Sequence, residues 1–312
     1  MQRNPMQVKL SEGSMLSRLD PYVFGSMSLG NEEIPFGERL SMARYAMERC
    51  GWFHTSHKYG STMDVLAQAF RDLPVRVPKC ICKLSGDSLD EVRRQIDLQL
   101  EKLGIPQIHI GQLHVGGALA ADLRAGGDCL DGLRAIREEG LVGGFTLEVH
   151  PWTSAIALDH LRSGRGFDII EGYSFYFNPL QRYALNALFA LILQLERPIL
   201  SIRTVAGGPI ERQAARPPHP DDFLQKRSAE LLPLYEQSDH ANWVDFCMNF
   251  VLSQPGVVCT IGACSTPAHL DDYLAVLQQD MPAFQGTLAR RILAMQSKWS
   301  EEKDVHAAEW TM

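Results

Sequence analysis

The stretch Gly51-Trp-Phe-His-Thr-Ser-His-Lys-Tyr-Gly60 joins an apolar strand end to a polar loop. Trp52 and Phe53 are typical of the end of a buried strand, and Gly60 closes the polar run that follows. The loop brings a phenol, an ammonium and two imidazoles together within a few residues. Because loops at strand ends often carry the reactive groups of a rigid scaffold, this stretch predicts a reaction site.

Two more apolar runs end in a side chain that handles protons. Lys83 follows the run Val77-Pro-Lys-Cys-Ile-Cys82, and His114 follows the run Ile108-His-Ile-Gly-Gln-Leu113. An ammonium at a buried strand end costs free energy unless another group pairs with it or uses it. We therefore expect Tyr59, Lys83 and His114 to converge on one site.

Strands and helices alternate along the chain. Apolar runs predict strands over residues 22–25, 52–54, 78–82, 108–113, 142–146, 168–171, 198–202 and 257–261. Segments with helical spacing predict helices over residues 38–50, 62–72, 88–103, 129–139, 152–163, 181–195, 240–253 and 267–278. Eight such units in roughly 250 residues indicate an α/β fold with parallel strands, a closed (β/α)8 TIM barrel. A doubly wound open sheet is the alternative, but its first turn needs the pattern Gly-x-Gly-x-x-Gly, which Gly25-Ser-Met-Ser-Leu-Gly30 lacks.

The length suits one barrel-sized domain. The chain has 312 residues, 45% of them hydrophobic, which is enough to bury a large core. We expect a single domain over 1–312, with the barrel in about 20–280 and a C-terminal helix and tail in 281–312. The segment 203–239 after the seventh strand is too long for a turn, which is typical of a functional lid or a disordered loop.

Charge and cysteine content point to an ordinary cytoplasmic protein. The chain has 30 Lys and Arg against 37 Asp and Glu, a net charge of −7, and no basic block that predicts a nucleic acid or an anionic membrane as partner. Its seven cysteines show no Cys-x-x-Cys spacing, and an odd count in a large core favours reduced thiols. No apolar run reaches the roughly 18 residues of a transmembrane helix.

With these motifs the sequence resembles the aldo-keto reductase superfamily. The family's strand-two signature Asp-Thr-Ala-x-x-Tyr-Gly matches residues 54–60, with His54 for Asp and Ser56 for Ala. Its Thr-Lys pair matches Cys82-Lys83, and its Leu-His pair matches Leu113-His114. The resemblance implies an NAD(P)-dependent oxidoreductase acting on a small aldehyde, ketone or alcohol, with NADP(H) or NAD(H) as cofactor.

The resemblance also implies the roles of four catalytic positions. Tyr59 is the general acid that protonates the carbonyl oxygen, and Lys83 lowers its pKa by placing a positive charge nearby. His114 orients the carbonyl. His54 stands where the family has an aspartate that pairs with the lysine, so the carboxylate of the family's site is missing from that position.

A cofactor site follows from the same resemblance. Gly144-Phe-Thr-Leu147 matches the family's Gly-Val-Ser-Asn turn, and Ile169-Ile-Glu-Gly-Tyr173 matches its Gln-containing strand. The segment from Gly262 to Tyr273 matches the family's adenosine-phosphate motif, a helix N-terminus, and the loop after strand seven covers the pyrophosphate in the family. The implied dinucleotide residues are Gly25, Ser26, Thr146, Glu171, Arg203, Gly262, Ala263, Cys264, Ser265, His269, Asp272 and Tyr273.

The histidine at position 54 leaves other chemistry open. Without a carboxylate beside it, Lys83 is expected to lose its charge by burial and act as a Schiff-base nucleophile, as in a lyase. A non-catalytic, cofactor-binding scaffold is the third possibility. A titrating His54 predicts pH dependence near 6.5. The imidazoles of His54, His57 and His114 form only a weak metal pattern without an acidic residue, so no metal is expected.

Large aromatic side chains supply candidate walls for the substrate pocket, although each also suits an ordinary core position. They are Trp52, Tyr176, Phe177 and Trp243. The identity of the small-molecule substrate and the oligomeric state do not follow from the sequence, because specificity in such barrels depends on the geometry of loop side chains.

Overall fold

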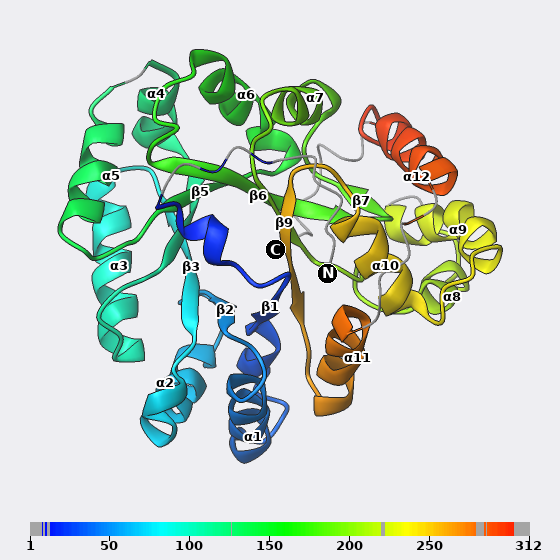
Figure 1. Cartoon of the computed structure of the whole chain (residues 1–312), viewed down its shortest axis with the longest axis horizontal. Helices are drawn as coiled ribbons and strands as arrows, with labels where there is room; N and C mark the ends of the chain where they lie inside the picture. The colour runs from blue at the N-terminus through cyan, green and yellow to red at the C-terminus, as the bar shows by residue number, and fades with distance from the viewer. Residues whose placement is uncertain are drawn as a thin grey trace.

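A closed barrel of parallel strands forms the centre of the molecule (Figure 1). We describe a computed structural model, which places residues 8, 10, 13–125, 127–219, 222–278, 284 and 286–302. The strand order is β5-β4-β3-β2-β1-β9-β8-β6-β7, and pairing of β5 with β6 closes the ring. The barrel pairings are parallel, and among the strands of the described residues only the short β7 is antiparallel to its neighbour, β6. This arrangement confirms the predicted (β/α)8 barrel.

All eight predicted strands are present, β1 with the predicted bounds and the others with shifted ends. They are β1 Tyr22–Gly25, β2 Trp52–Thr55, β3 Lys79–Gly86, β4 Ile110–Val115, β5 Phe145–Glu148, β6 Ile170–Asn178, β8 Ile199–Ile202 and β9 Val257–Ala263. The additional strand β7, Gln181–Arg182, lies where the sequence predicted the start of a helix. The largest difference is in β6, which extends to Asn178 instead of ending at residue 171.

Alternation along the strands separates two apolar layers. Inward-facing side chains form a small cluster inside the barrel that comprises Leu16, Leu19, Val23, Trp52, Ile81, Ile110, Leu200, Ile202, Cys259 and Ile261. Outward-facing side chains join the helices in a much larger cluster around the barrel, with Phe24, Phe53 and Phe145 among its fully buried members. Because side chains alternate along a strand, most of the barrel strands contribute to both layers.

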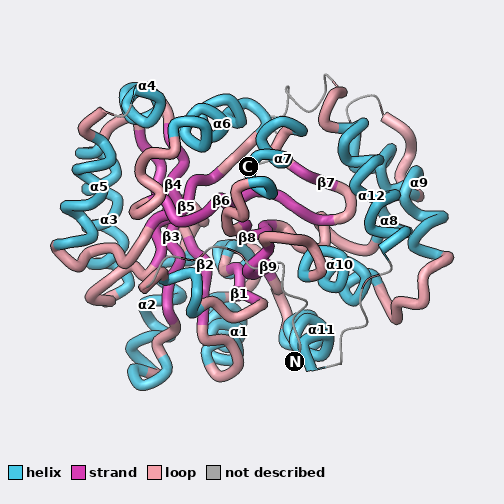
Figure 2. Tube along the Cα trace, turned by 45° about the horizontal axis from the view of Figure 1, so that its top comes forward, coloured by secondary structure: helices cyan, strands magenta, loops and turns pink. Residues whose placement is uncertain are grey.

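Helices surround the barrel (Figure 2). The α-helices are α1 Phe36–Met47, α2 Thr62–Asp72, α3 Leu89–Leu103, α4 Gly117–Ala125, α5 Cys129–Glu138, α6 Ser154–Ser163, α7 Asn186–Gln194, α8 Ile210–Ala214, α9 Phe223–Glu236, α10 Trp243–Leu252, α11 Pro267–Gln278 and α12 Gly286–Trp299. Short 3-10 helices are η1 Met15–Arg18, η2 Met27–Gly30, η3 Pro74–Arg76 and η4 Pro151–Thr153. None of the described helices is long and apolar enough to cross a membrane.

Local signals account for the ends of α3. The Ser88 hydroxyl accepts a hydrogen bond from the Glu91 amide at the first turn, and Gly104 ends the helix in a left-handed conformation with φ of 65°. Helix α4 was not predicted. It begins at Gly117, directly after Gly116, and its small side chains give little helical periodicity.

The amino-terminal segment closes one end of the barrel. The Ser14 hydroxyl donates a hydrogen bond to Glu171, and the indole of Trp52 donates one to the Arg18 carbonyl oxygen at 2.9 Å. Leu16 and Leu19 extend into the inner cluster from the same segment. Access to the barrel interior is therefore left to the carboxyl ends of the strands, where TIM barrels place their reactive groups.

The long segment after β8 is largely helical. It contains α8 and α9, which lie beside α10 and α12 at the side of the barrel (Figure 1). The predicted C-terminal helix is present as α12. Its Gln296 donates hydrogen bonds to the carbonyl oxygens of Asn178 and Pro179 at the end of β6, and the Trp299 indole donates one to Glu230 on α9. Residues 281–283, 285 and 303–312 of the predicted C-terminal segment lie outside the described part.

Candidate active site

Lys83 lies inside β3, with its side chain 26% exposed toward the carboxyl end of the barrel. Its ammonium lies 2.7 Å from Oε1 of Glu148 on β5 and donates a hydrogen bond to it. The expectation that Lys83 has no carboxylate beside it is therefore wrong. The pairing is not visible in the sequence, because Glu148 lies 65 residues after Lys83, on another strand.

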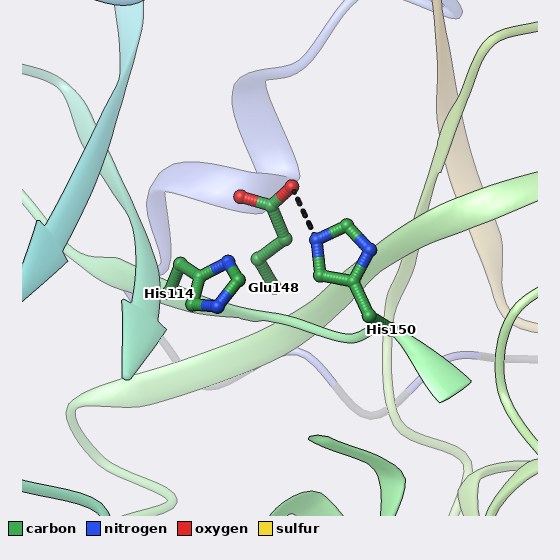
Figure 3. Close-up of side chains that lie close together, drawn as sticks. All are labelled: His114, Glu148 and His150. Atoms are coloured by element: carbon green, nitrogen blue, oxygen red, sulfur yellow. Dashed lines mark ion pairs between the residues drawn. The ribbon is translucent and has the colours of Figure 1, made fainter. Parts of the chain in front are cut away.

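Glu148 connects three side chains at the mouth of the barrel. Its Oε1 also lies 3.2 Å from Nε2 of His150, and the carboxylate is 2% exposed. Figure 3 shows this contact, with His114 on the other side of the carboxylate. The sequence analysis missed both Glu148 and His150. A signal was available for Glu148, because it follows Thr146 by two positions and strand alternation directs both to the barrel interior.

The charges of Lys83 and Glu148 stabilise each other. Burial by itself disfavours both charged forms. The Glu148 charge and hydrogen bond nevertheless raise the pKa of Lys83 above its usual value. Burial also opposes ionisation of Glu148, but Lys83 and His150 hold the pKa of its carboxyl well below its usual range. Lys83 is thus an ammonium and Glu148 a carboxylate at neutral pH.

Tyr59 lies in the loop after β2, half-buried, within reach of the same ammonium. Burial raises the pKa of the phenol to about 12, while the charge of Lys83 and a hydrogen bond with it act in the opposite direction. The phenol therefore carries its proton at neutral pH, and a positive charge stands ready to stabilise the phenolate. These are the properties of a general acid.

His54 is buried at the end of β2, 3% exposed. Burial, followed by the charge of Lys83, lowers its pKa to about 3, so the imidazole is neutral throughout the physiological range. Its ring lies 6.2 Å from that of Tyr59 between centroids. The predicted titration of His54 near pH 6.5 is wrong because a cation and a low-dielectric environment both oppose its protonation.

His114 and Tyr176 complete a group of polar side chains at the carboxyl end of the barrel. We call this group the polar mouth; its other members are Tyr59, Lys83, Glu148, His150 and His54. Burial lowers the pKa of His114, although the nearby charge of Glu148 opposes the shift. The His114 and His150 rings lie 5.1 Å apart between centroids. Tyr176 on β6 stacks on Tyr183 at 4.6 Å between centroids. Burial raises the pKa of its phenol, and the charges of Lys83 and Glu148 shift that pKa in opposite directions. The structure thus brings Tyr59, Lys83 and His114 together, as predicted.

Of the four aromatic candidates for pocket walls, only Tyr176 lies near these groups. Trp52 contacts Arg18 at the closed end of the barrel. Phe177 packs with Phe189 and Phe250 between barrel and helices. Trp243 is buried at the start of α10.

The predicted adenosine-phosphate segment joins the end of β9 to α11. Ala263, Ser265, His269 and Asp272 are exposed there, and the Thr266 hydroxyl accepts a hydrogen bond from the His269 amide. Three other predicted members are buried and have packing roles: Tyr273 stacks on Tyr22 at 4.8 Å, Cys264 contacts the Tyr22 hydroxyl at 3.3 Å, and Gly262 leaves room for both rings. Only part of the segment can therefore contact a ligand.

Glu171 lies at the amino-terminal end of β6, where it accepts a hydrogen bond from Ser14. This end of the barrel is closed, so the geometry does not support the cofactor role that the sequence predicted for Glu171. The resemblance of residues 169–173 to the family's Gln-containing strand predicted that role, but β6 extends to Asn178, so Glu171 lies near the start of the strand. The β6 residue that contacts Thr146 is Ser174, and the two hydroxyl oxygens lie 3.0 Å apart.

The remaining predicted cofactor residues lie at carboxyl ends of strands. Gly25 ends β1, and the Ser26 hydroxyl donates a hydrogen bond to the His54 carbonyl oxygen at 2.9 Å. Arg203 follows β8 with φ of 64°, a conformation that is unusual for a residue with a Cβ. Its guanidinium lies 5.5 Å from the centre of the Tyr176 ring and so reaches the polar mouth.

A metal pattern exists, but not the one weighed from the sequence. Ligand atoms of His114, Glu148 and His150 all lie within 4.8 Å of one another, whereas His54 and His57 are outside this group. The Lys83 ammonium already lies 2.7 Å from Oε1 of the same carboxylate. Because a dication there would stand next to an ammonium, the site as formed is better suited to pairing Lys83 than to holding a metal.

A hollow of about 490 Å³ lies at the opposite end of the molecule from these groups. It is lined by charged residues around the starts of β2 and β3, including Arg18, Asp20, Arg76 and Lys79. Hollow volume by itself therefore does not locate the reactive groups, and the convergence of side chains does.

Comparison with known proteins gives the family. The model of the aldo/keto reductase family matches residues 21–287, which cover most of the chain. The chain belongs to the aldo/keto reductase family. A search of curated proteins finds no match.

Solved aldo-keto reductases share the fold at low sequence identity. One from Bacillus halodurans, in its holo form, is 16% identical with a TM-score of 0.69, covering 88% of this chain and 92% of its own. One from Klebsiella pneumoniae, in complex with NADP and acetate, is 15% identical with a TM-score of 0.65, covering 89% and 92%. A putative aldo-keto reductase from Pseudomonas aeruginosa is 18% identical with a TM-score of 0.58, covering 83% and 90%.

Proposed function

We propose that this protein is an NAD(P)(H)-dependent oxidoreductase that reduces a small aldehyde or ketone, or oxidises the corresponding alcohol. The observation that supports the proposal is the convergence at the open end of the barrel of the Tyr59 phenol with the Lys83 ammonium, which Glu148 holds at 2.7 Å. A protonated phenol beside a fixed positive charge is suited to protonate a carbonyl oxygen as hydride arrives.

The neighbouring groups fit the same reaction. When the phenol loses its proton, Lys83 stabilises the phenolate that remains. His114, neutral because burial lowers its pKa, is able to donate a hydrogen bond to the carbonyl oxygen and orient it. In the alcohol-oxidising direction the same phenolate accepts the proton. Tyr59 therefore acts as general acid or base, Lys83 tunes it, and His114 positions the substrate.

The groups around the mouth also suit a dinucleotide. The N-terminus of α11, with exposed Ser265 and His269, offers backbone amides to a phosphate. Arg203 supplies a cation, and the paired hydroxyls of Thr146 and Ser174 supply polar atoms inside the barrel. A bound nicotinamide supplies the hydride. NADP appears in the Klebsiella pneumoniae relative, and the choice between NADP(H) and NAD(H) belongs to the binding test below.

The ion pair of Lys83 argues against the Schiff-base alternative. An amine attacks a carbonyl only in its neutral form, and Glu148 at 2.7 Å favours the charged form. Measuring turnover of carbonyl substrates distinguishes an enzyme from a scaffold that binds the cofactor without catalysis.

The test combines dinucleotide binding with substitution of the acid. Quenching of tryptophan fluorescence by NADPH and NADH should show saturable binding in the micromolar range. Tyr59→Phe should lower kcat by ~10²–10⁴ with an aldehyde panel and leave the dinucleotide Kd unchanged. Tyr173→Phe is the matched control, since the Tyr173 hydroxyl lies 2.8 Å from Nδ1 of His160 on α6, between the barrel and the helices. Saturable binding without turnover of any carbonyl would support the scaffold instead, and absence of binding would reject both.

A further inference from the structure

We propose that Glu148 is a positioning residue for the reaction, in place of the carboxylate that the family carries at the position of His54. In this chain the carboxylate that pairs with Lys83 of β3 comes from β5, whereas the resembled family carries it on β2. This inference rests on the proposed oxidoreductase function. It explains how a chain with a histidine at position 54 retains a charged lysine beside Tyr59.

The strand register makes the exchange possible. Lys83 is paired with Gln112 on β4, and Gln112 is paired with Thr146 on β5. Two residues further along β5, the side chain of Glu148 is directed into the barrel at a higher level and reaches back over β4 to Lys83. The carboxylate thus approaches the ammonium from the β4–β5 side, whereas the family's aspartate and the loop of Tyr59 belong to β2.

The contacts of the carboxylate fix its orientation. Oε1 accepts a hydrogen bond from Lys83 at 2.7 Å. The same oxygen lies 3.2 Å from Nε2 of His150. His150 is itself held by its ring stack on Trp152, with centroids 4.6 Å apart and planes 4° from parallel. A carboxylate held from two sides is able to hold the flexible lysine side chain in one place.

Charge balance favours a carboxylate near Lys83 when position 54 is a histidine. A buried ammonium without a partner is strongly unfavourable, and His54 cannot supply a negative charge. With Glu148 present, the polar mouth keeps one ammonium and one carboxylate. The Glu148 charge acts on Lys83, Tyr59, His114, Tyr176 and His54, so it reaches every titratable group of the proposed site.

The experiment transfers the carboxylate that pairs with Lys83 from position 148 on β5 to position 54 on β2. Glu148→Gln keeps the shape of the side chain and removes its charge, and the double variant His54→Asp/Glu148→Gln restores a carboxylate on β2. We expect Glu148→Gln to lower kcat for an aldehyde at least ~10-fold, and the double variant to recover most of that loss, because the ammonium beside Tyr59 is again paired. The alkaline limb of the kcat profile should move to lower pH in Glu148→Gln and return in the double variant.

A second readout does not need turnover. In protein labelled with ¹³C at lysine Cε, the Lys83 resonance, assigned by its loss in Lys83→Met, reports the charge on the amine. We expect it to titrate at lower pH in Glu148→Gln than in the native protein and to return in the double variant. Glu171→Gln, which removes the charge of a second buried glutamate on the barrel strands, should leave the Lys83 titration unchanged.

The outcomes separate the two proposals. A native protein without turnover rejects the proposed function, while the Lys83 titration still tests the pairing. A native protein with turnover, whose kcat, pH profile and Lys83 titration are unchanged in Glu148→Gln, overturns the role of Glu148. If Glu148→Gln does not fold, failure of the folded double variant to show native-like turnover and titration overturns it equally. Stoichiometric zinc that leaves on Glu148→Gln would assign the carboxylate to a metal instead, and also overturn it.

Discussion

At the scale of single residues, His54 is a buried neutral imidazole next to a cation. Its pKa is about 3 in the folded protein, because of burial and the charge of Lys83, against about 6.5 when unfolded. Between these values the unfolded chain binds a proton that the folded chain does not, so stability falls as pH falls through this window. We predict that His54→Gln makes the free energy of unfolding less dependent on pH between about pH 4 and 6. The slope should decrease by up to about 1.4 kcal/mol per pH unit, which corresponds to one proton. Urea unfolding at several pH values measures this slope. Equal slopes in both proteins would show that His54 is protonated when folded.

At the scale of elements, β9 and α11 meet β1 through two rings and a glycine. Tyr22 and Tyr273 stack at 4.8 Å, and a Cβ on Gly262 would lie 2.9 Å from the Tyr273 ring. Gly262→Ala must therefore push α11 away from β9, and we predict a loss of ~1–3 kcal/mol in the free energy of unfolding together with weaker dinucleotide binding. Gly37→Ala is the matched control, because nothing lies within 4 Å of its added Cβ on α1, and it should leave both quantities unchanged or raise stability. A native-like Gly262→Ala would mean that α11 is not held against β9 in this way.

At the scale of the whole molecule, α12 ties the end of the chain to the barrel. Trp299 is 1% exposed, lies under the guanidinium of Arg227 at 5.2 Å, and donates a hydrogen bond to Glu230. We propose that residues 1–312 form one domain, and predict that Trp299→Ala lowers the free energy of unfolding of the entire barrel by ~3–5 kcal/mol. Far-UV circular dichroism during urea unfolding measures this, with the more exposed Trp152→Ala as the milder comparison. Loss of the α12 signal alone, with the main transition unmoved, would show that α12 is a separate appendage.

By itself, the sequence determined the barrel and the convergence of Tyr59, Lys83 and His114. Strand periodicity and the alternation of units are local properties, and a parallel barrel places the carboxyl ends of its strands at one mouth. Only the tertiary structure decided what pairs with Lys83. Register across β3, β4 and β5 brings Glu148 to within 2.7 Å of it, and no sequence spacing encodes that distance. The same reason explains why the sequence predicted Glu171 for the cofactor site, whereas the structure places Ser174 beside Thr146. The bounds of β6 are set by its pairing with β5 and β8, and these bounds decide which of its residues lies near the mouth of the barrel.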